Sequence, residues 1–178
     1  MTSQQWFTLL VVAVSLERLV ELGLARRNLR WSLAHGGHEV GRGHFRWMVL
    51  LHIGLLVGCL VEVWLLGSPW LPWLGWPMLG LVLLSQGLRW WCIATLGRQW
   101  NTRIVVVPGM ARVNGGPYRW MSHPNYVAVV VEGFALPLVH TAWVTATIFT
   151  VLNAILLRTR VATENQALES LASMPVRP

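Results

Sequence analysis

Lysine and aspartate are absent from this chain of 178 residues, and charged side chains make up only 12% of it. Soluble globular domains contain roughly 25% charged residues, so an ordinary water-soluble fold is excluded. Only two cysteines occur, Cys59 and Cys92, and both lie in apolar stretches. A disulfide-stapled scaffold is therefore excluded, and we expect both thiols to be packed as small apolar groups. Hydrophobic residues account for 54% of the chain, which is too many for a disordered protein.

The basic residues are all arginine, 14 in number, and the formal net charge is +7. A nucleic-acid-binding domain with such an excess mixes cationic and aromatic side chains on one solvated face. In this sequence the arginines instead gather between long apolar stretches, as they do in the loops of membrane proteins. We therefore expect the partners of the chain to include membrane lipid and no nucleic acid.

Five apolar stretches divide the sequence. A hydrocarbon core of about 30 Å is crossed by about 20 helical residues, a length that the first three stretches reach. The five stretches are Trp6–Leu24, Trp47–Leu66, Trp73–Leu96, Tyr126–Val139 and Ala142–Leu157. They predict an all-α integral membrane protein with five transmembrane helices and no Rossmann domain. In the second stretch, Gly54 and Gly58 have the spacing that lets a neighbouring helix approach closely. We expect the polar tail from Arg158 to about Pro175 to form a further helix at the surface.

The placement of arginine predicts how the chain is oriented. Arginines occur in the first connection, in the third connection and after the last apolar stretch, whereas the second connection and the turn at His140 have none. Because arginine-rich loops stay on the cytoplasmic side, we expect the N-terminus to lie outside and the C-terminus to lie in the cytoplasm.

Four acidic residues and Arg18 lie inside the apolar stretches. Arg18 and Glu21 share a helix face, and we expect them, beside Glu17, to form a neutral ion pair that faces the bundle. Glu62 lies near the outer end of its helix and is expected to reach the headgroups. Glu132 has no partner near it in the sequence. Because an ionisable group inside a membrane helix is a candidate functional residue, Glu132 either belongs to the site or makes a structural hydrogen bond.

The first connection contains a glycine-rich segment with three histidines and a glutamate, from His35 to His44. These residue types could ligate a metal ion, but the surrounding glycines would leave the side chains unfixed. A flexible cytoplasmic loop, or a lid over a site, is the favoured interpretation, and no metal is expected. Neither a dinucleotide-binding motif nor a P-loop is present in the sequence.

The third connection has a more specific pattern. The β-branched run Ile104–Val107 is followed by Pro108-Gly109 and later by Gly115-Gly116-Pro117. This order indicates a short extended piece and two tight turns. The fourth helix then opens with Pro124 in its first turn, where proline is tolerated. By itself the pattern fits a helix start at the membrane interface as well as a functional site.

The motifs around these turns resemble those of the isoprenylcysteine carboxyl methyltransferase family. They are Gly116-Pro117-Tyr118, His123-Pro124-Asn125-Tyr126, an apolar helical hairpin, and Arg160 with Glu164 and Leu168. The resemblance covers roughly Trp100 to Leu168, and the set is specific although each piece alone is weak. The His-Glu-Val-Gly-Arg-Gly-His segment of the first half is similar to bacterial members of the family that are encoded beside type III polyketide synthases. We therefore expect the protein to lie in a bacterial inner membrane.

The resemblance implies a multi-helix membrane enzyme that binds S-adenosylmethionine in a cytoplasmic-facing pocket. Arg160 matches the position that handles the methyl acceptor, so we assign it a catalytic and substrate-binding role. The implied cofactor-binding residues are Arg103, Met110, Ala111, Arg112, Val113, Tyr118, His123, Pro124, Asn125, Tyr126 and Glu164. Residues 1–96 would then form the membrane part and residues 97–178 the catalytic part of a single functional domain.

The sequence departs from the family pattern at two positions. Ser122 stands where the family usually has an arginine before His-Pro, which removes a cation from beside a cationic cofactor. Asn165 stands where a second glutamate commonly follows Glu164. An amide can hydrogen-bond but adds no charge. We therefore assign Asn165 to substrate binding and favour a neutral or weakly acidic acceptor oxygen.

We expect the enzyme to methylate an oxygen of a lipophilic acceptor, and two kinds of acceptor stay open. A hydroxyl on a long-chain polyketide would need a base, for which Glu132 and His123 are the candidates. A prenylcysteine-like carboxylate is already ionised near neutral pH and would need only a positioning cation such as Arg160. A small transporter subunit or a membrane assembly factor is the non-enzymatic alternative. The sequence does not predict the oligomeric state.

Overall fold

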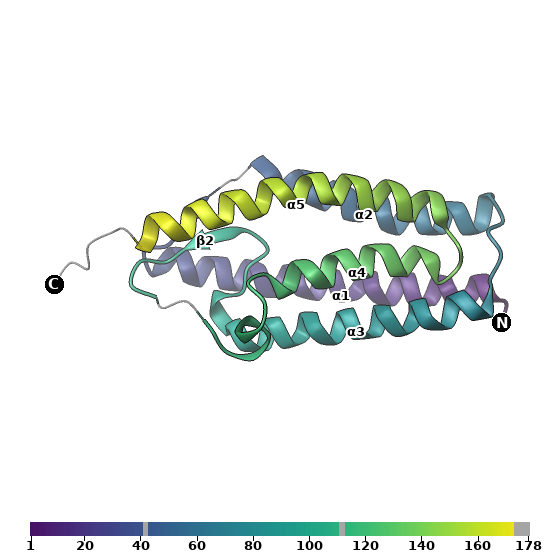
Figure 1. Ribbon diagram of the computed structural model, residues 1–178, viewed down its shortest axis with the longest axis horizontal. Helices are drawn as coiled ribbons and strands as arrows, with labels where there is room; N and C mark the ends of the chain where they lie inside the picture. The colour runs from purple at the N-terminus through teal and green to yellow at the C-terminus, as the bar shows by residue number, and fades with distance from the viewer. Residues whose placement is uncertain (41–42, 111–112, 173–178) are drawn as a thin grey trace.

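The computed structural model describes residues 1–40, 43–110 and 113–172, and only the backbone of His44 and of residues 167–172. Five long helices run roughly along one axis and form an elongated bundle (Figure 1). They are α1 (Ser3–Ala34), α2 (Gly43–Leu65), α3 (Pro72–Leu96), α4 (Pro124–Leu138) and α5 (Trp143–Ala172). Short pieces complete the described chain: 3-10 turns η1 (Gly97–Gln99) and η2 (Gly116–Arg119), and strands β1 (His38–Val40) and β2 (Ile104–Val106).

The five apolar stretches each form a helix, as predicted. Within the described residues, three helical segments are long and apolar enough to cross a membrane: Phe45–Leu65, Pro72–Gln99 and Trp143–Gln166. The helix α4 is apolar but shorter, with 15 residues. Helix α1 has the length but carries Glu17, Arg18 and Glu21 within it. The fold is therefore that of a helical membrane protein.

Two predicted helix boundaries are wrong. Helix α1 was expected to end at Leu24 but continues through the arginine-rich stretch to Ala34, because arginine is a good helix former. The tail from Arg158 was expected to form a separate surface helix but is the continuation of α5. No glycine or proline interrupts the sequence between Trp143 and Ala172, so nothing breaks the helix where its composition turns polar.

The apolar core lies between the helices along most of the bundle, and both cysteines are buried in it as free thiols. A Cβ at Gly133 of α4 would overlap the Phe149 ring of α5, so this glycine sets the close approach of the two helices. The expected close contact in α2 is half present. Gly58 faces Thr145 of α5, whereas Gly54 has open space beside it.

Glu62 does not reach toward the headgroups, as the sequence had suggested. Its side chain is buried and accepts hydrogen bonds from the backbone N–H groups of Val144 and Thr145, at 3.0 and 2.8 Å. The Thr145 hydroxyl donates to it as well, at 2.7 Å. The first turn of a helix has N–H groups without intrahelical partners and a partial positive charge. A carboxylate from α2 therefore caps the N-terminus of α5.

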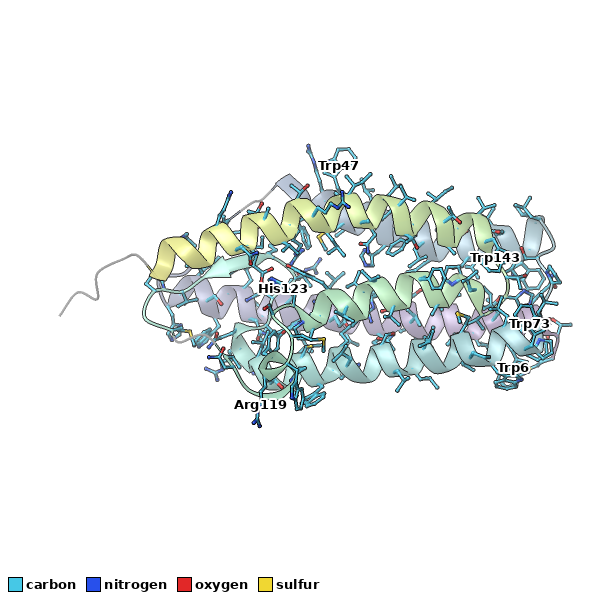
Figure 2. All side chains as sticks on the ribbon, viewed as in Figure 1. Trp6, Trp47, Trp73, Arg119, His123 and Trp143 are labelled. Carbon is cyan, nitrogen blue, oxygen red and sulfur yellow. The ribbon has the colours of Figure 1, made fainter. Side chains whose placement is uncertain are left out.

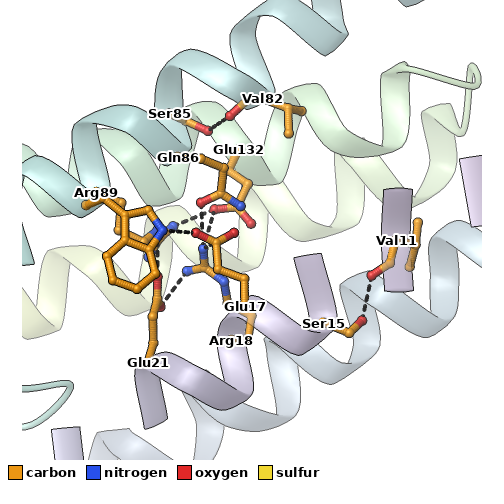
Figure 3. Close-up of polar contacts among 11 residues, drawn as sticks. Val11, Ser15, Glu17, Arg18, Glu21, Val82, Ser85, Gln86, Arg89 and Glu132 are labelled. Atoms are coloured by element: carbon orange, nitrogen blue, oxygen red, sulfur yellow. Dashed lines mark hydrogen bonds and ion pairs between the residues drawn. The ribbon is translucent and has the colours of Figure 1, made fainter. Parts of the chain in front are cut away.

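The charges of α1 join a buried network with α3 and α4 (Figure 3). The expected ion pair is present, since Arg18 donates to Glu21 at 2.8 Å. Glu132 has two cationic partners, Arg89 at 2.5 Å and Arg18 at 3.4 Å, and Arg89 also approaches Glu21 at 3.5 Å. Both partners come from helices that are distant in the sequence, so Glu132 has the structural contacts that were one of its two expected roles. We call Arg18, Glu21, Arg89 and Glu132 the buried charge network.

The first and third connections meet in a two-stranded antiparallel ribbon. Glu39 of β1 lies opposite Val105 of β2, and the Glu39 carboxylate pairs with Arg103 at 3.0 Å. Part of the segment expected to be a flexible loop is thus a strand. The extended piece predicted in the third connection is confirmed as β2. The two turns are confirmed as well, with Gly109 and Gly116 at φ of +78° and +53°, where a side chain would be strained.

Candidate functional site

A cavity of about 490 Å³ lies at the end of the bundle where the ribbon is found. Its walls come from the last turns of α1 and α3, the segment through β2, the start of α4 and the second half of α5. His123, at the head of α4, marks this end in Figure 2. The volume is in the range of small-molecule binding sites.

Most of the residues predicted for the site line this cavity. They are Arg103, Met110, Val113, Tyr118, His123, Asn125, Tyr126, Arg160 and Glu164. Pro124 is buried at the first position of α4 and does not line the cavity. The predicted Ala111 and Arg112 lie outside the described residues.

Two predicted residues lie away from the cavity. Asn165 is exposed on α5 and is not part of the wall. Glu132 is seven residues after Asn125 on α4, about 10 Å along the helix, and belongs to the buried charge network. Their predicted roles in substrate binding and catalysis stay predictions.

The polar centre of the wall is a chain of contacts through Tyr126. The Tyr126 hydroxyl donates to the Glu164 carboxylate and accepts a hydrogen bond from Arg160 Nε at 2.8 Å. The His123 ring stacks on the Tyr126 ring with their centroids 5.3 Å apart. Nδ1 of His123 is 3.9 Å from Glu164. A phenol thus holds a buried cation and a half-exposed carboxylate in fixed positions on one wall.

The Arg160 guanidinium is also fixed from two other directions. Its Nη2 donates to the Thr102 carbonyl at 2.6 Å, and its Nη1 donates to the Met48 sulfur at 2.7 Å. The side chain is almost fully buried, with the residue 7% exposed. These contacts and the one to Tyr126 use three of the five N–H donors of a guanidinium. Arg160 therefore joins α2, α4, α5 and the segment before β2.

Arg103 reaches the cavity from the ribbon. Its guanidinium pairs with Glu39 and stacks over the Phe45 ring, 4.5 Å from the ring centroid. The side chain is about one third exposed, so the pair contributes little to stability. Its effect is to hold a cation at the rim of the cavity.

Two residues that follow η1 belong to the cavity wall although the sequence pattern did not predict them. Trp100 and Asn101 line the cavity, and a buried amide from α1, Asn28, holds this segment by donating to the Trp100 carbonyl at 2.7 Å. Among the described residues, Trp100 Nε1, Asn101 Oδ1 and Asn125 Oδ1 are buried without a hydrogen-bond partner. The available signal was a polar stretch, Gln99–Arg103, between an apolar helix and a β-branched run.

Tyr118 lies across the cavity on η2. Burial raises the pKa of the Tyr118 phenol above its ordinary value, so the hydroxyl stays protonated near neutral pH and can donate a hydrogen bond. The wall therefore combines donors, acceptors and one carboxylate with several aromatic faces, which suits a polar ligand that carries both charge and ring systems.

Comparison with known proteins shows which family the chain belongs to, and the match includes most residues of the cavity wall. The chain is 37% identical over 166 residues to a Bacillus subtilis (strain 168) protein named uncharacterized protein YpbQ, covering 92% of this chain and 96% of the relative. The family model for isoprenylcysteine carboxyl methyltransferases matches residues 78–170, which is more than half of the chain. That range contains every residue of the cavity wall except Ser32. The chain therefore belongs to the isoprenylcysteine carboxyl methyltransferase family.

Proposed function

We propose that this protein is a membrane methyltransferase that uses S-adenosylmethionine to methylate an oxygen of a lipophilic acceptor. The observation that carries the proposal is the convergence of Tyr126, Arg160 and Glu164 on one wall of a cavity that opens at the polar end of an apolar bundle. These residues belong to the segments that the family model matches.

The residues of the cavity fit S-adenosylmethionine in kind and number. Glu164 would hold a cationic or hydroxyl group, while the partnerless Asn101 Oδ1, Asn125 Oδ1 and Trp100 Nε1 offer two acceptors and one donor to a polar ligand. A buried polar atom without a partner costs about 1–3 kcal/mol, so a ligand that satisfies these three atoms gains affinity. S-adenosylmethionine, when bound, supplies an electrophilic methyl group on a sulfonium.

The rest of the reaction depends on the position of the acceptor oxygen. Methyl transfer needs little covalent help, so the protein contributes mainly by holding both partners and excluding water. Arg160 would position the acceptor oxygen with its remaining N–H groups. Three of its five donors already bind the protein, so two N–H groups remain for the acceptor. We keep a hydroxyl on a long-chain ring compound as the first candidate acceptor and a prenylcysteine-like carboxylate as the second.

A hydroxyl acceptor must lose its proton, and we infer that His123 would take it. The ring lines the cavity with Nδ1 toward Glu164. The proton would therefore be accepted at Nε2, the ring nitrogen that does not face Glu164. Glu132, the other candidate base, does not line the cavity.

An apolar groove between α2 and α5 supports a lipophilic acceptor. It has a volume of about 530 Å³ and is lined by apolar side chains together with Gly54, Gly58 and Thr145. One end of the groove, at Trp47 and Leu156, lies next in sequence to Met48 and one helical turn from Arg160. A hydrocarbon tail in the groove would leave its polar head near the Arg160 guanidinium.

Titration of the detergent-purified protein with S-adenosylhomocysteine tests the cofactor site. Glu164→Ala and His123→Ala should each weaken binding by about tenfold to a hundredfold, because a charge-assisted hydrogen bond is worth roughly 1.5–3 kcal/mol. Gln166→Ala, exposed on the same helix, is the matched control and should bind like the wild type. No binding by the folded wild type would reject the enzyme and favour a transporter subunit or an assembly factor.

The acceptor is tested by offering radiolabelled S-adenosylmethionine with an alkylresorcinol and a farnesylcysteine analogue in parallel. For a hydroxyl acceptor, the rate should rise with pH as the hydroxyl or its base loses a proton. A carboxylate acceptor has a pKa near 4, so its rate should be flat above about pH 6. Methylation of the farnesylcysteine analogue alone would overturn the preference for a hydroxyl acceptor, while the assignment as a methyltransferase would stand.

A further inference from the structure

The end of the bundle that contains the cavity has exposed arginines without acidic counterparts. In the part of the chain that the structure describes, the exposed arginines are Arg26, Arg27, Arg30, Arg46, Arg98, Arg119 and Arg158. No acidic side chain of the same residues is exposed, and no ion pair joins a described acidic group to any of the seven. We call these seven residues the arginine ring.

The members of the arginine ring come from several elements and not from one helix. They come from the last third of α1, the first turn of α2, the residues after α3, the turn η2 and the middle of α5. These segments lie between the middle of the bundle and its cavity end (Figure 1). Figure 2 shows Arg119 at this end and Trp6, Trp73 and Trp143 at the other.

Exposed tryptophans show how deep the arginine ring lies in a membrane. On α2, Trp47 and Trp64 are both about half exposed and are separated by about 26 Å at 1.5 Å per residue. On α3, Trp73 and Trp91 are exposed as well, about 27 Å apart by the same rise. These separations are close to the thickness of the hydrocarbon core, about 30 Å. Since tryptophan collects at both membrane interfaces, the four residues mark the two edges of the bilayer.

Two members of the arginine ring, Arg46 and Arg98, lie next to the edge marked by Trp47 and Trp91. Arg46 precedes Trp47 directly and stacks on its ring, with the guanidinium 5.4 Å from the centroid. Arg98 follows the last turn of α3 and stacks over Trp31 at 5.6 Å. This is the depth of the lipid phosphates.

We propose that the arginine ring binds the phosphate groups of anionic phospholipids in the leaflet at the cavity end. One guanidinium group can donate two N–H groups to two oxygens of the same phosphate. The phosphates of a leaflet lie at one depth on all sides of a membrane protein. A nucleic acid would instead need its cations along one continuous face. Each arginine near an anionic surface strengthens binding by about fivefold.

The test measures lipid binding by native mass spectrometry of the detergent-purified protein, titrated separately with phosphatidylglycerol, phosphatidylcholine and inorganic phosphate. The wild type should retain several phosphatidylglycerol molecules and far fewer phosphatidylcholine molecules, and its thermal midpoint should rise with phosphatidylglycerol only. The combined variant Arg26→Gln, Arg27→Gln, Arg30→Gln should bind phosphatidylglycerol more weakly by on the order of a hundredfold. The matched variant with lysine at the same three positions should keep most of the binding.

Three outcomes would overturn the proposal. Equal retention of both lipids by the wild type would show that charge does not select the lipid. Unchanged phosphatidylglycerol binding by the glutamine variant, with an unchanged thermal midpoint, would show that the exposed arginines do not bind the lipid. A thermal shift produced fully by inorganic phosphate would indicate a site for a free anion in place of a lipid surface.

Discussion

Tyr126 is the residue on which the geometry of the cavity wall depends most. Its hydroxyl lies between Arg160 and Glu164, and its ring supports His123. If Arg160 and Glu164 formed a direct ion pair, neither charge would be available to bind a ligand. The intervening phenol keeps them apart, so that one cation and one carboxylate face the cavity separately.

Removal of this hydroxyl should therefore reduce ligand binding more than stability. We expect Tyr126→Phe to weaken S-adenosylhomocysteine binding by about tenfold, because the loss of one hydrogen bond to a charged group costs about 1.5 kcal/mol. Calorimetric titration measures the affinity, and Val127→Ala, the exposed neighbour on α4, is the control. A Tyr126→Phe protein with the affinity of the wild type would show that the bridge has no role in the site.

At this scale the sequence predicts residue types in motifs but not long-range partners. His123, Tyr126 and Glu164 were found because their spacing is specific as a set. Trp100 and Asn101 were not, because their polar atoms matter only through what packs around them. The cap made by Glu62 was also out of reach, since its partners are 82 and 83 residues further along the chain.

The elements themselves follow hydrophobic periodicity and length closely, except where composition changes within a helix. The expected start and end of α3 agree with the structure to one residue, because turn-forming residues precede it and Gly97 follows it. The sequence predicts a connection at the polar end of α1 and a separate surface helix at the polar end of α5, whereas both segments continue their helices. The reason is that hydropathy reports the environment of a helix and not its hydrogen bonds. The ribbon of β1 and β2 was half predicted, because pairing between two loops leaves no local signal.

The buried charge network clamps α1 to α3 and α4, and its removal tests the predicted catalytic role of Glu132. Glu132→Gln should lower the free energy of unfolding by about 3 kcal/mol, since it leaves the buried Arg89 without its closest anion. The double variant Arg89→Met, Glu132→Leu should recover most of that loss, because Arg18 keeps Glu21 as its partner.

Thermal unfolding and methyl transfer per folded molecule measure the two effects separately. The position of Glu132 two helical turns from Asn125 leads us to expect that activity returns with stability in the double variant. A stable but inactive double variant would instead establish Glu132 as part of the catalytic machinery.

At the scale of the whole molecule, the two ends of the bundle differ in how many arginines they carry. The cavity, the ribbon and the arginine ring share one end, and the connections at the other end contain no arginine. The first 96 residues and the rest are joined by the ribbon and by the Arg89–Glu132 pair.

This asymmetry predicts that the cavity end is cytoplasmic. Single cysteines at Ser68 and Gln166, introduced into a Cys59→Ala, Cys92→Ala background, should react with an impermeant thiol reagent from opposite sides of the membrane. Ser68 should be labelled from outside in intact cells, and Gln166 only after permeabilisation. The control is the Cys59→Ala, Cys92→Ala protein, which has no thiol and should not react. Labelling of both positions from the same side would contradict the predicted topology.

The buried charge network also has a consequence for the order in which the chain is built. Arg18 leaves the ribosome 114 residues before Glu132, an interval of about 6–23 s at 5–20 residues per second. During that time α1 carries three charged side chains without the helices that later surround them. We therefore expect α1 to take its final position in the bilayer only after α3 and α4 have been made, although it is the first helix to be synthesised.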